Sequence, residues 1–104
     1  MKKIMLICAA GMSTSLLVTK MEQAAEAAGE QAEIFALPIL DGTKRLAEVD
    51  CVLLGPQVRY NLANIRNQIK ELGLSIPCDV IDMRDYGTMN GEKVFAFAKK
   101  LMSE

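Results

Sequence analysis

Short apolar runs recur along the chain and predict the strands of an α/β fold. The runs at Lys3–Cys8 and Cys51–Leu54 are almost continuously apolar, which is typical of central parallel strands covered on both faces. Two other runs, Ala32–Ala36 and Cys78–Ile81, contain more polar residues, so we expect them at the edges of the sheet. The pattern therefore predicts a sheet of four strands.

Between and after these runs, apolar residues recur every three or four positions, which indicates amphipathic helices. Gly29 and Gly73 each follow one of these segments and are typical helix stops, and Leu72 is the expected last buried position before Gly73. Asp41 is the expected N-cap of a short helix. The predicted helices cover Ser13–Ala28, Asp41–Val49, Tyr60–Leu72 and Gly91–Met102.

The alternation of strands and helices favours a parallel sheet with right-handed crossovers and helices on both faces. For four strands we expect the order 2-1-3-4, which places the first and third strands side by side. This architecture is flavodoxin-like and similar to that of low-molecular-weight phosphatases. No linker, repeat or low-complexity segment interrupts the pattern, so we expect one domain over residues 1–104.

The composition excludes several classes of function. The chain of 104 residues contains no histidine, which removes the Ser-His-Asp triad, the Cys-His dyad and nearly every catalytic zinc site. Its formal net charge is −1 and its pI is near 5.5, so it lacks the basic surface that neutralises phosphates in nucleic-acid binding. We therefore expect no nucleic acid among its partners.

The three cysteines, at positions 8, 51 and 78, form no CxxC motif. This spacing predicts neither a zinc ribbon nor a thioredoxin-type redox pair, and we expect no metal and no cofactor. Cys51 and Cys78 fall within strand patterns and are expected in the core. An odd number of cysteines without other secretory signs favours a reducing compartment, so we expect a cytoplasmic protein. The longest apolar run, Ile4–Ala10, is far shorter than the roughly 20 residues that span a bilayer, so we expect no membrane insertion.

The segment after the first predicted strand has the composition of an anion-binding loop. Its small residues let the backbone turn tightly, Gly11 can adopt a positive φ, and successive N–H groups can then converge at the start of the next helix. Hydroxyl side chains at that helix start add further donors, and one of them is the expected N-cap. The expected phosphate-binding loop comprises Ala9, Ala10, Gly11, Met12, Ser13, Thr14 and Ser15.

Cys8 stands at the rim of this loop, where we expect an accessible and reactive thiol. The thiolate is the nucleophilic form of cysteine, and converging N–H groups at a helix N-terminus favour that form without a histidine partner. The alternative is that Cys8 only ends a buried strand and that the small residues only make a turn. The pattern CxxGxSTS at the first strand–helix junction favours the reactive thiol over that alternative.

Three segments together give the chain a family resemblance. Cys8–Val18, Leu54–Tyr60 and Val80–Asp82 resemble the enzyme IIB component of the lactose/cellobiose/chitobiose class of the phosphoenolpyruvate-dependent sugar phosphotransferase system, and the likeness covers essentially the whole chain. The resemblance implies that Cys8 is the catalytic residue, which accepts a phosphoryl group from a histidine of enzyme IIA and passes it to a disaccharide bound by the membrane permease, enzyme IIC. It also implies that residues 9–15 hold the phosphoryl oxygens.

The loop itself favours a phosphoryl carrier over a hydrolase. Tyrosine phosphatases with a Cys-x5-Arg loop use the arginine to bind phosphate and to stabilise the transition state. Here Thr14 stands at that position and no Arg or Lys lies between Cys8 and Lys20, so the loop is neutral and hydrolysis should be slow. A phosphatase or an arsenate reductase is one alternative, although no cysteine stands in an obvious resolving position. A non-catalytic anion- or nucleotide-binding module is another, and it would make Cys8 dispensable.

The segments after the third and fourth predicted strands have two interpretations each. The first holds candidate contacts to the phosphoryl group or to a partner, or else forms a rigid turn fixed by Pro56. The second resembles the general-acid loop of low-molecular-weight phosphatases, but without the loop arginine we interpret its residues as solvated turn residues. The residues concerned are Gln57, Arg59 and Tyr60 in the first segment and Asp82, Asp85 and Tyr86 in the second.

Nothing in the sequence dictates oligomerisation, so we expect a monomer. The sequence does not indicate which disaccharide is transported.

Overall fold

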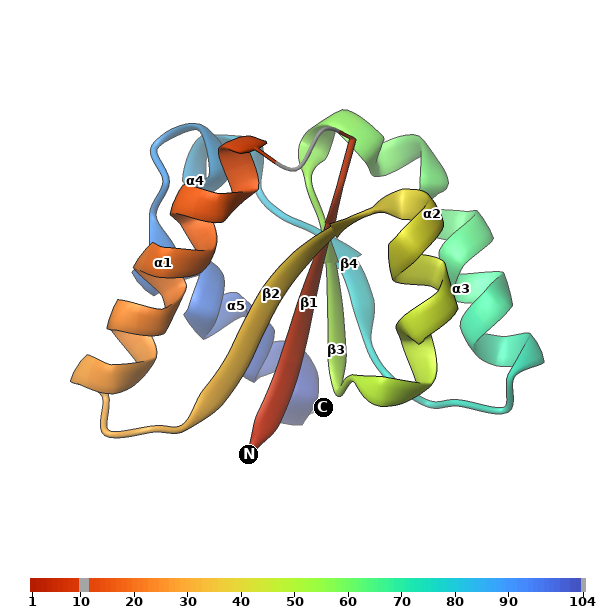
Figure 1. The fold of residues 1–104 in the computed structure, drawn as a ribbon, viewed down its shortest axis with the longest axis horizontal. Coiled ribbons are helices and arrows are strands. Elements are labelled where there is room, and N and C mark those ends of the chain that lie inside the picture. The colour runs from red at the N-terminus through yellow and green to blue at the C-terminus, as the bar shows by residue number, and fades with distance from the viewer. Residues whose placement is uncertain (10–11, 104) are drawn as a thin grey trace.

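Four parallel strands form one sheet at the centre of the molecule (Figure 1). The computed structural model describes residues 1–9 and 12–103. Along the sheet the strands follow the order β2-β1-β3-β4 and every neighbouring pair is parallel, so the predicted fold class is confirmed, with the second and fourth strands at the edges. The strands are β1 (Lys2–Cys8), β2 (Ala32–Pro38), β3 (Cys51–Leu54) and β4 (Cys78–Val80).

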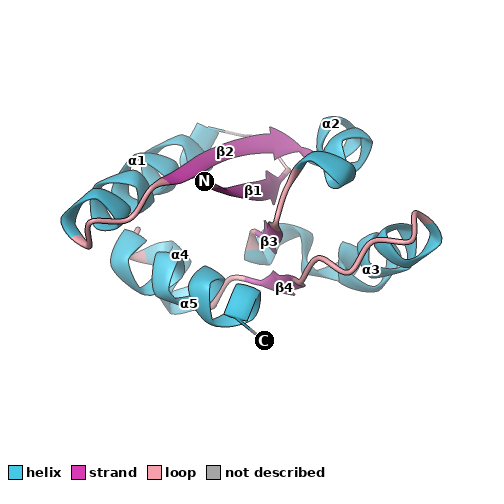
Figure 2. Cartoon of the chain, turned by 90° about the horizontal axis from the view of Figure 1, so that it is seen from below, coloured by secondary structure: helices cyan, strands magenta, loops and turns pink. Residues whose placement is uncertain are grey.

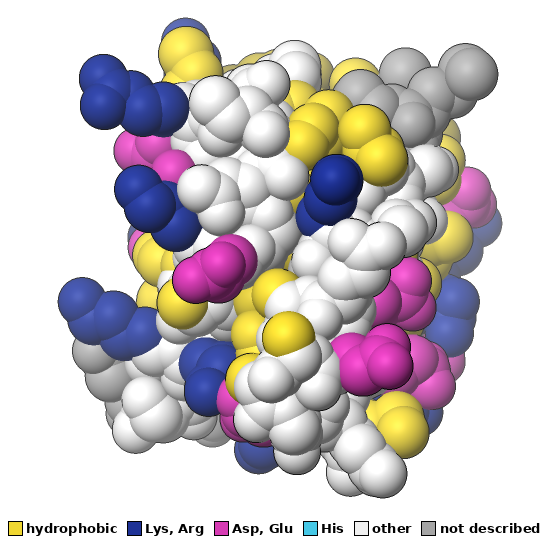
Figure 3. All heavy atoms as spheres, turned by 90° about the vertical axis from the view of Figure 1, so that its left-hand side faces the viewer, with side chains coloured by type: hydrophobic (Ala, Val, Ile, Leu, Met, Phe, Trp, Pro, Cys, Tyr) yellow, Lys and Arg dark blue, Asp and Glu magenta, His cyan; other side chains and the backbone are white. Residues whose placement is uncertain are grey.

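Helices cover both faces of the sheet (Figure 2). The helical elements are α1 (Met12–Ala27), α2 (Ile39–Gly42), the 3-10 segments η1 (Thr43–Glu48) and η2 (Pro56–Asn61), α3 (Leu62–Glu71), α4 (Met83–Gly87) and α5 (Gly91–Ser103). Helices α1, α4 and α5 lie on one face, and α2 and α3 lie on the other. On the side of α1, the described basic and acidic side chains are interspersed rather than gathered into one patch (Figure 3).

The hydrophobic core lies on both sides of β1. Residues Ile4 to Cys8 are all buried. Ile4 and Leu6 face the cluster formed with α1 and α5, whereas Met5 and Ile7 face the cluster formed with η1 and α3. This burial on both faces explains why the sequence of β1 is continuously apolar. Cys8 therefore ends a strand whose last five residues are all buried.

The first and last helices lie close together at Gly91. A Cβ atom added there would lie 2.3 Å from the backbone carbonyl carbon of Lys20, which is closer than real Cβ contacts come. Helix α5 therefore begins with a glycine because the backbone of α1 occupies the space that a side chain would need.

Two predicted helix starts and one predicted burial are wrong. The chain becomes helical at Pro56 rather than Tyr60, because a proline at the first helical position already has the required φ and lacks only an N–H that the helix would leave unpaired. Leu72 is 58% exposed, since it is the C-cap residue beyond the end of α3. Asp41 caps no helix; it lies inside α2, whose N-cap residue is Pro38.

Candidate functional site

The carboxyl ends of the four strands meet at one edge of the sheet, where Cys8 is the last residue of β1. In the strand register, Cys8 pairs with Pro38 of β2 and Ile7 pairs with Leu54 of β3. Just after β3, the Gly55 N–H donates a hydrogen bond to the Ile7 carbonyl at 2.9 Å. The segments that follow β1 and β3 therefore lie side by side, as the predicted strand order required.

The sulfur of Cys8 is held between α1 and β2. The hydroxyl of Thr14, in the first turn of α1, donates to Cys8 Sγ at 3.2 Å. The thiol in turn donates to the carbonyl oxygen of Leu37 at 3.8 Å. Thr14 is fully buried, so water does not compete for its hydroxyl. A buried hydroxyl that donates to sulfur stabilises negative charge there, and the thiolate is the form of cysteine that attacks phosphorus.

The sulfur is less accessible than the sequence indicated. Cys8 is only 3% exposed, so the prediction of an accessible thiol at the rim of the loop is wrong for this conformation. The thiol is hydrogen-bonded to the Thr14 hydroxyl of α1 on one side and to the Leu37 carbonyl of β2 on the other. A reaction partner must therefore reach a sulfur that neighbouring groups cover.

The structure describes only part of the predicted phosphate-binding loop. Ala9 and Ser15 are exposed, and Thr14 is buried against the sulfur. The predicted cradle of N–H groups depends mainly on the residues between them, so it stays a prediction. Outside the described part lie the whole of Ala10 and Gly11 and the side chains of Met12 and Ser13.

The three candidate contacts after β3 all lie on η2 and are exposed. Gln57, Arg59 and Tyr60 can each be reached by a partner protein. Gln57 also packs against the turn before it, because a Cβ added to Gly55 would lie 3.0 Å from its Oε1 atom. Within residues 1–9 and 12–103, no hydrogen bond joins any of the three to Cys8. Their contact with a phosphoryl group stays a prediction.

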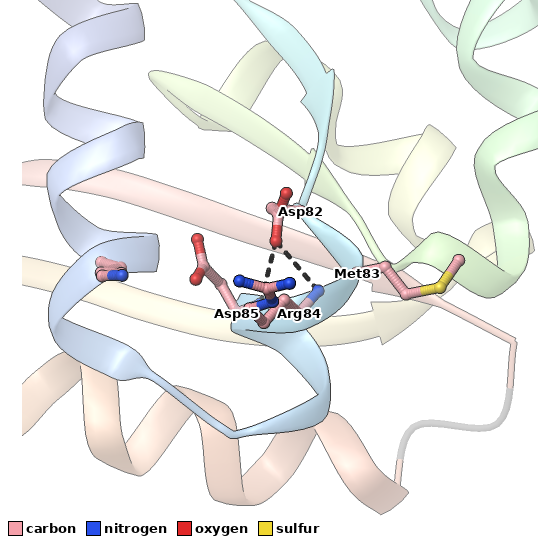
Figure 4. A pocket seen from close by; sticks show the side chains of 5 residues that line it. Asp82, Met83, Arg84 and Asp85 are labelled. Atoms are coloured by element: carbon pink, nitrogen blue, oxygen red, sulfur yellow. Dashed lines mark hydrogen bonds between the residues drawn. The ribbon is translucent and has the colours of Figure 1, made fainter.

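After β4 the chain forms a short helix, α4, which the sequence interpretation missed. Asp82 is its N-cap, and its Oδ1 accepts hydrogen bonds from the backbone N–H groups of Arg84 at 2.9 Å and Asp85 at 3.1 Å (Figure 4). Asp82 is exposed as expected, but Tyr86 is buried, so its interpretation as a solvated residue is wrong. An acidic residue three positions after an Asp N-cap is the signal that would have predicted this helix.

Two hollows lie beside α4 at the same edge. The first, of about 640 Å³, is lined mainly by charged side chains, and Figure 4 shows Met83 pointing away from the acidic groups. The second, of about 430 Å³, lies between η2 and α4. The first is lined by Asp82, Met83, Arg84, Asp85 and Lys93, and the second by Pro56, Gln57, Arg59, Met83, Tyr86, Gly87 and Met89.

The other two cysteines have different surroundings, although all three are buried and free. Burial raises the pKa of Cys51 to about 12, and nearby Cys78 and two carboxylates act in the same direction. Burial also raises the pKa of Cys78 to about 12, against the opposing effect of the Arg66 guanidinium. Both thiols stay protonated at neutral pH, and their expected place in the core is confirmed.

Two features are missing from the part of the chain that the structure describes. No three His, Cys, Asp or Glu side chains there come together as metal ligands would. No helix there combines the length and the apolar character that crossing a membrane requires.

Comparison with known proteins decides the family of this chain. A family model described as "PTS system, Lactose/Cellobiose specific IIB subunit" matches residues 3–97. The chain belongs to this family. Its general reaction is therefore phosphotransfer within a sugar phosphotransferase system, as the resemblance implied.

Relatives of this IIB subunit cover nearly its whole length. The PTS system galactose-specific EIIB component of Lactococcus lactis subsp. cremoris is 47% identical over 98% of this chain and 97% of that protein. The oligo-beta-mannoside-specific EIIB component of Bacillus subtilis is 40% identical with the same coverage. The solution structure of the cellobiose-specific IIB component from Borrelia burgdorferi matches with a TM-score of 0.79 and 38% identity, over 98% of this chain and 92% of that one. The lactose-specific IIB domain of Streptococcus pneumoniae, at 16% identity, shares the fold with a TM-score of 0.83 over 96% of both chains.

Proposed function

We propose that this IIB subunit is a cytoplasmic phosphoryl carrier. Cys8 accepts a phosphoryl group from a phosphohistidine of enzyme IIA and passes it to a disaccharide of the lactose/cellobiose type bound by the membrane permease, enzyme IIC. The observation that carries the proposal is the 3.2 Å hydrogen bond from the buried Thr14 hydroxyl to Cys8 Sγ, at a strand end that is followed by a helix. Cys51 and Cys78, in contrast, begin their strands.

Each transfer exchanges one bond to phosphorus. In the first, the Cys8 thiol loses its proton to solvent and the sulfur attacks phosphorus; the S–P bond forms as the N–P bond breaks, and the electron pair of the broken bond returns to the imidazole nitrogen. In the second, a sugar hydroxyl oxygen attacks, its proton passes to a base of the permease, and the electron pair of the S–P bond returns to sulfur. Thr14 supports both steps because its hydroxyl donates to the sulfur when the sulfur is negatively charged.

The neutral loop supports a carrier rather than a hydrolase. No Arg or Lys lies between Cys8 and Lys20, and a buried hydroxyl, that of Thr14, stands where phosphatases have arginine. A phosphocysteine without a bidentate arginine lacks the strongest stabilisation of the transition state for attack by water. The phosphoryl group should therefore persist on the sulfur until the acceptor arrives.

The alternatives find less support in the structure. An arsenate reductase needs a second thiol to resolve its intermediate, but Cys51 and Cys78 are buried and each has a pKa of about 12. A phosphatase needs the cation that the loop lacks. A non-catalytic anion- or nucleotide-binding module gives no role to the hydrogen bond between Thr14 and Cys8.

The test is the covalent adduct. The chain is incubated with phosphoenolpyruvate, the two general phosphotransferase proteins and an enzyme IIA of the lactose/cellobiose class, and its intact mass is measured. We expect one phosphoryl adduct on the wild type and on Cys78→Ala, and none on Cys8→Ser. An adduct that survives in Cys8→Ser would contradict the proposal, and so would turnover of p-nitrophenyl phosphate by the chain alone.

A further inference from the structure

Large apolar side chains that are exposed gather at the carboxyl edge of the sheet. One follows the end of each strand: Leu16 follows β1, Leu40 follows β2, Tyr60 follows β3 and Met83 follows β4. Their exposed fractions range from 51% for Leu16 to 78% for Tyr60. The parallel topology puts all four at the edge where Cys8 lies. Scattered exposed apolar residues need no explanation, but a set that follows every strand end on the side of Cys8 indicates a surface that binds protein.

The hollow between η2 and α4 is the concave part of this surface. It has a volume of about 430 Å³, and Tyr86, Met83 and Met89 give it mainly apolar walls. Met83 points away from the acidic groups of α4, toward η2 (Figure 4). Methionine adapts its shape to different neighbours, which suits a wall that must accept a partner's side chain. The hollow therefore offers mainly apolar walls to a side chain of a partner protein.

The same hollow is tied to the strand that carries Cys8. Gly55, at the start of η2, donates its N–H to the carbonyl of Ile7, the residue before Cys8. A Cβ on Gly55 would lie 3.6 Å from the ring of Tyr86 and 3.0 Å from Gln57 Oε1, so two lining residues pack directly on this turn. A protein that filled the hollow would be positioned beside the end of β1.

Arg59 adds a charge to this hollow. It is exposed, and it takes part in none of the ion pairs found among residues 1–9 and 12–103. An exposed guanidinium beside an apolar hollow favours a partner that offers a carboxylate. The cytoplasmic loops of membrane proteins are instead enriched in Lys and Arg, which Arg59 would repel. Charge therefore favours the phosphoryl donor over the membrane acceptor as the occupant.

We infer that the hollow between η2 and α4 receives an apolar side chain of the phosphoryl-donor subunit, and that Arg59 pairs with a carboxylate of the same subunit. The inference rests on the proposed function and adds the contact that brings the donor to Cys8. Burial of an apolar anchor in a pocket is typical of the few residues that carry most of the binding energy of an interface. Met83 lies outside the predicted phosphoryl contacts, so replacing it should affect docking and leave the transfer step unchanged.

The test separates docking from chemistry. The initial rate of Cys8 phosphorylation is measured by intact mass at increasing concentrations of the phosphorylated enzyme IIA that modifies the wild type. Met83→Lys and Arg59→Glu should each raise the donor concentration for half-maximal rate by about fivefold or more, and in Met83→Lys the maximal rate should stay within about twofold of wild type. Added salt should weaken docking of the wild type more than docking of Arg59→Gln, because the exposed ion pair is screened.

Matched control variants lie at the opposite edge of the sheet. Leu72 is exposed to a similar degree as Met83, and Lys70 is an exposed cation at the end of α3, so Leu72→Lys and Lys70→Glu make equivalent changes far from Cys8. Both should dock like wild type. Circular dichroism melts of all five variants verify that each one folds.

Three results would overturn the inference. In the first, Met83→Lys and Arg59→Glu dock like the controls while the wild type is phosphorylated normally; the proposed function then stands. In the second, the two variants accept phosphate normally but slow its transfer to sugar in vesicles that contain the permease, which would assign the hollow to the acceptor. In the third, the wild type is never phosphorylated, which would remove the proposed function and this inference together.

Discussion

The sheet contains cysteine in two different environments, that of Cys8 and that shared by Cys51 and Cys78. All three are buried, so depth does not distinguish them. Cys51 and Cys78 begin their strands and lie among apolar side chains, where burial keeps them protonated. Cys8 ends its strand, and the following helix brings the hydroxyl of Thr14 to its sulfur. Position at the carboxyl end of a strand, rather than depth of burial, therefore distinguishes the candidate nucleophile Cys8 from the structural thiols of Cys51 and Cys78.

The largest contrast that we expect is in the rate of alkylation. At pH 8, a thiol with a pKa of about 12 is ionised in roughly one molecule in ten thousand. Cys51 and Cys78 should therefore react with iodoacetamide at least about a hundredfold more slowly than Cys8. Timed labelling of the native chain, followed by mass spectrometry of its peptides, measures the three rates. Equal rates would remove the distinction between the two settings.

A smaller contrast depends on the Thr14 hydroxyl. Thr14→Val keeps the shape of the side chain but removes the donor, and a hydrogen bond to a charged group is worth about 1.5–3 kcal/mol. Phosphorylation of Cys8 by enzyme IIA should slow by at least about tenfold, measured by intact mass at timed intervals. Thr14→Ser keeps a hydroxyl and should restore the rate. If Thr14→Val is phosphorylated as fast as wild type, the hydroxyl only fills space.

The smallest contrast concerns stability at high pH. In the folded chain Cys51 and Cys78 stay protonated up to a pH of about 12, whereas in the unfolded chain they titrate near their ordinary value of 9.0. The folded state binds more protons between these values, so the free energy of unfolding falls as pH rises above 9.0 toward 12. Each thiol contributes a slope of up to about 1.4 kcal/mol per pH unit.

Urea unfolding at several alkaline pH values measures this slope. Cys78→Ala should show a shallower fall than wild type, because one of the two titrating thiols is gone. Cys8→Ala serves as the matched variant that leaves both core thiols in place. A slope that is identical in wild type and Cys78→Ala would show that the folded state releases its core protons as easily as the unfolded state does.

The sheet could be predicted from the sequence because its determinants are local. Continuous apolar runs identified β1 and β3 as central strands, and the more polar runs identified the edges. Gly29 and Gly73 marked two helix ends, and both adopt the positive φ that such an end requires. The position of Cys8 at the junction of strand and helix followed from the same pattern. Strand order then placed the segment after β3 beside it.

The surroundings of the Cys8 sulfur, helix α4 and the hollow beside it could not be predicted. Hydrophobic periodicity does not encode contacts between segments far apart in the chain, nor helices of a few residues. The hydrogen bonds of the Cys8 sulfur join it to Leu37 of β2 and to Thr14 of α1, which meet only in the folded molecule. Helix α4 has five residues, too few for an amphipathic pattern, and its start is signalled only by the Asp82 cap. The hollow between η2 and α4 is likewise formed by two segments that follow different strands.

Gly91 connects the last helix to the chemistry at the end of the first strand. Because it has no side chain, α5 can rest directly on the backbone of α1 at Lys20. That contact helps to fix the line along which α1 runs, and the first turn of α1 carries the hydroxyl that meets the sulfur. An added methyl group at residue 91 would push the two helices apart. The alignment of donor and sulfur is thus maintained partly from a point more than seventy positions away in the sequence, by a residue that touches neither.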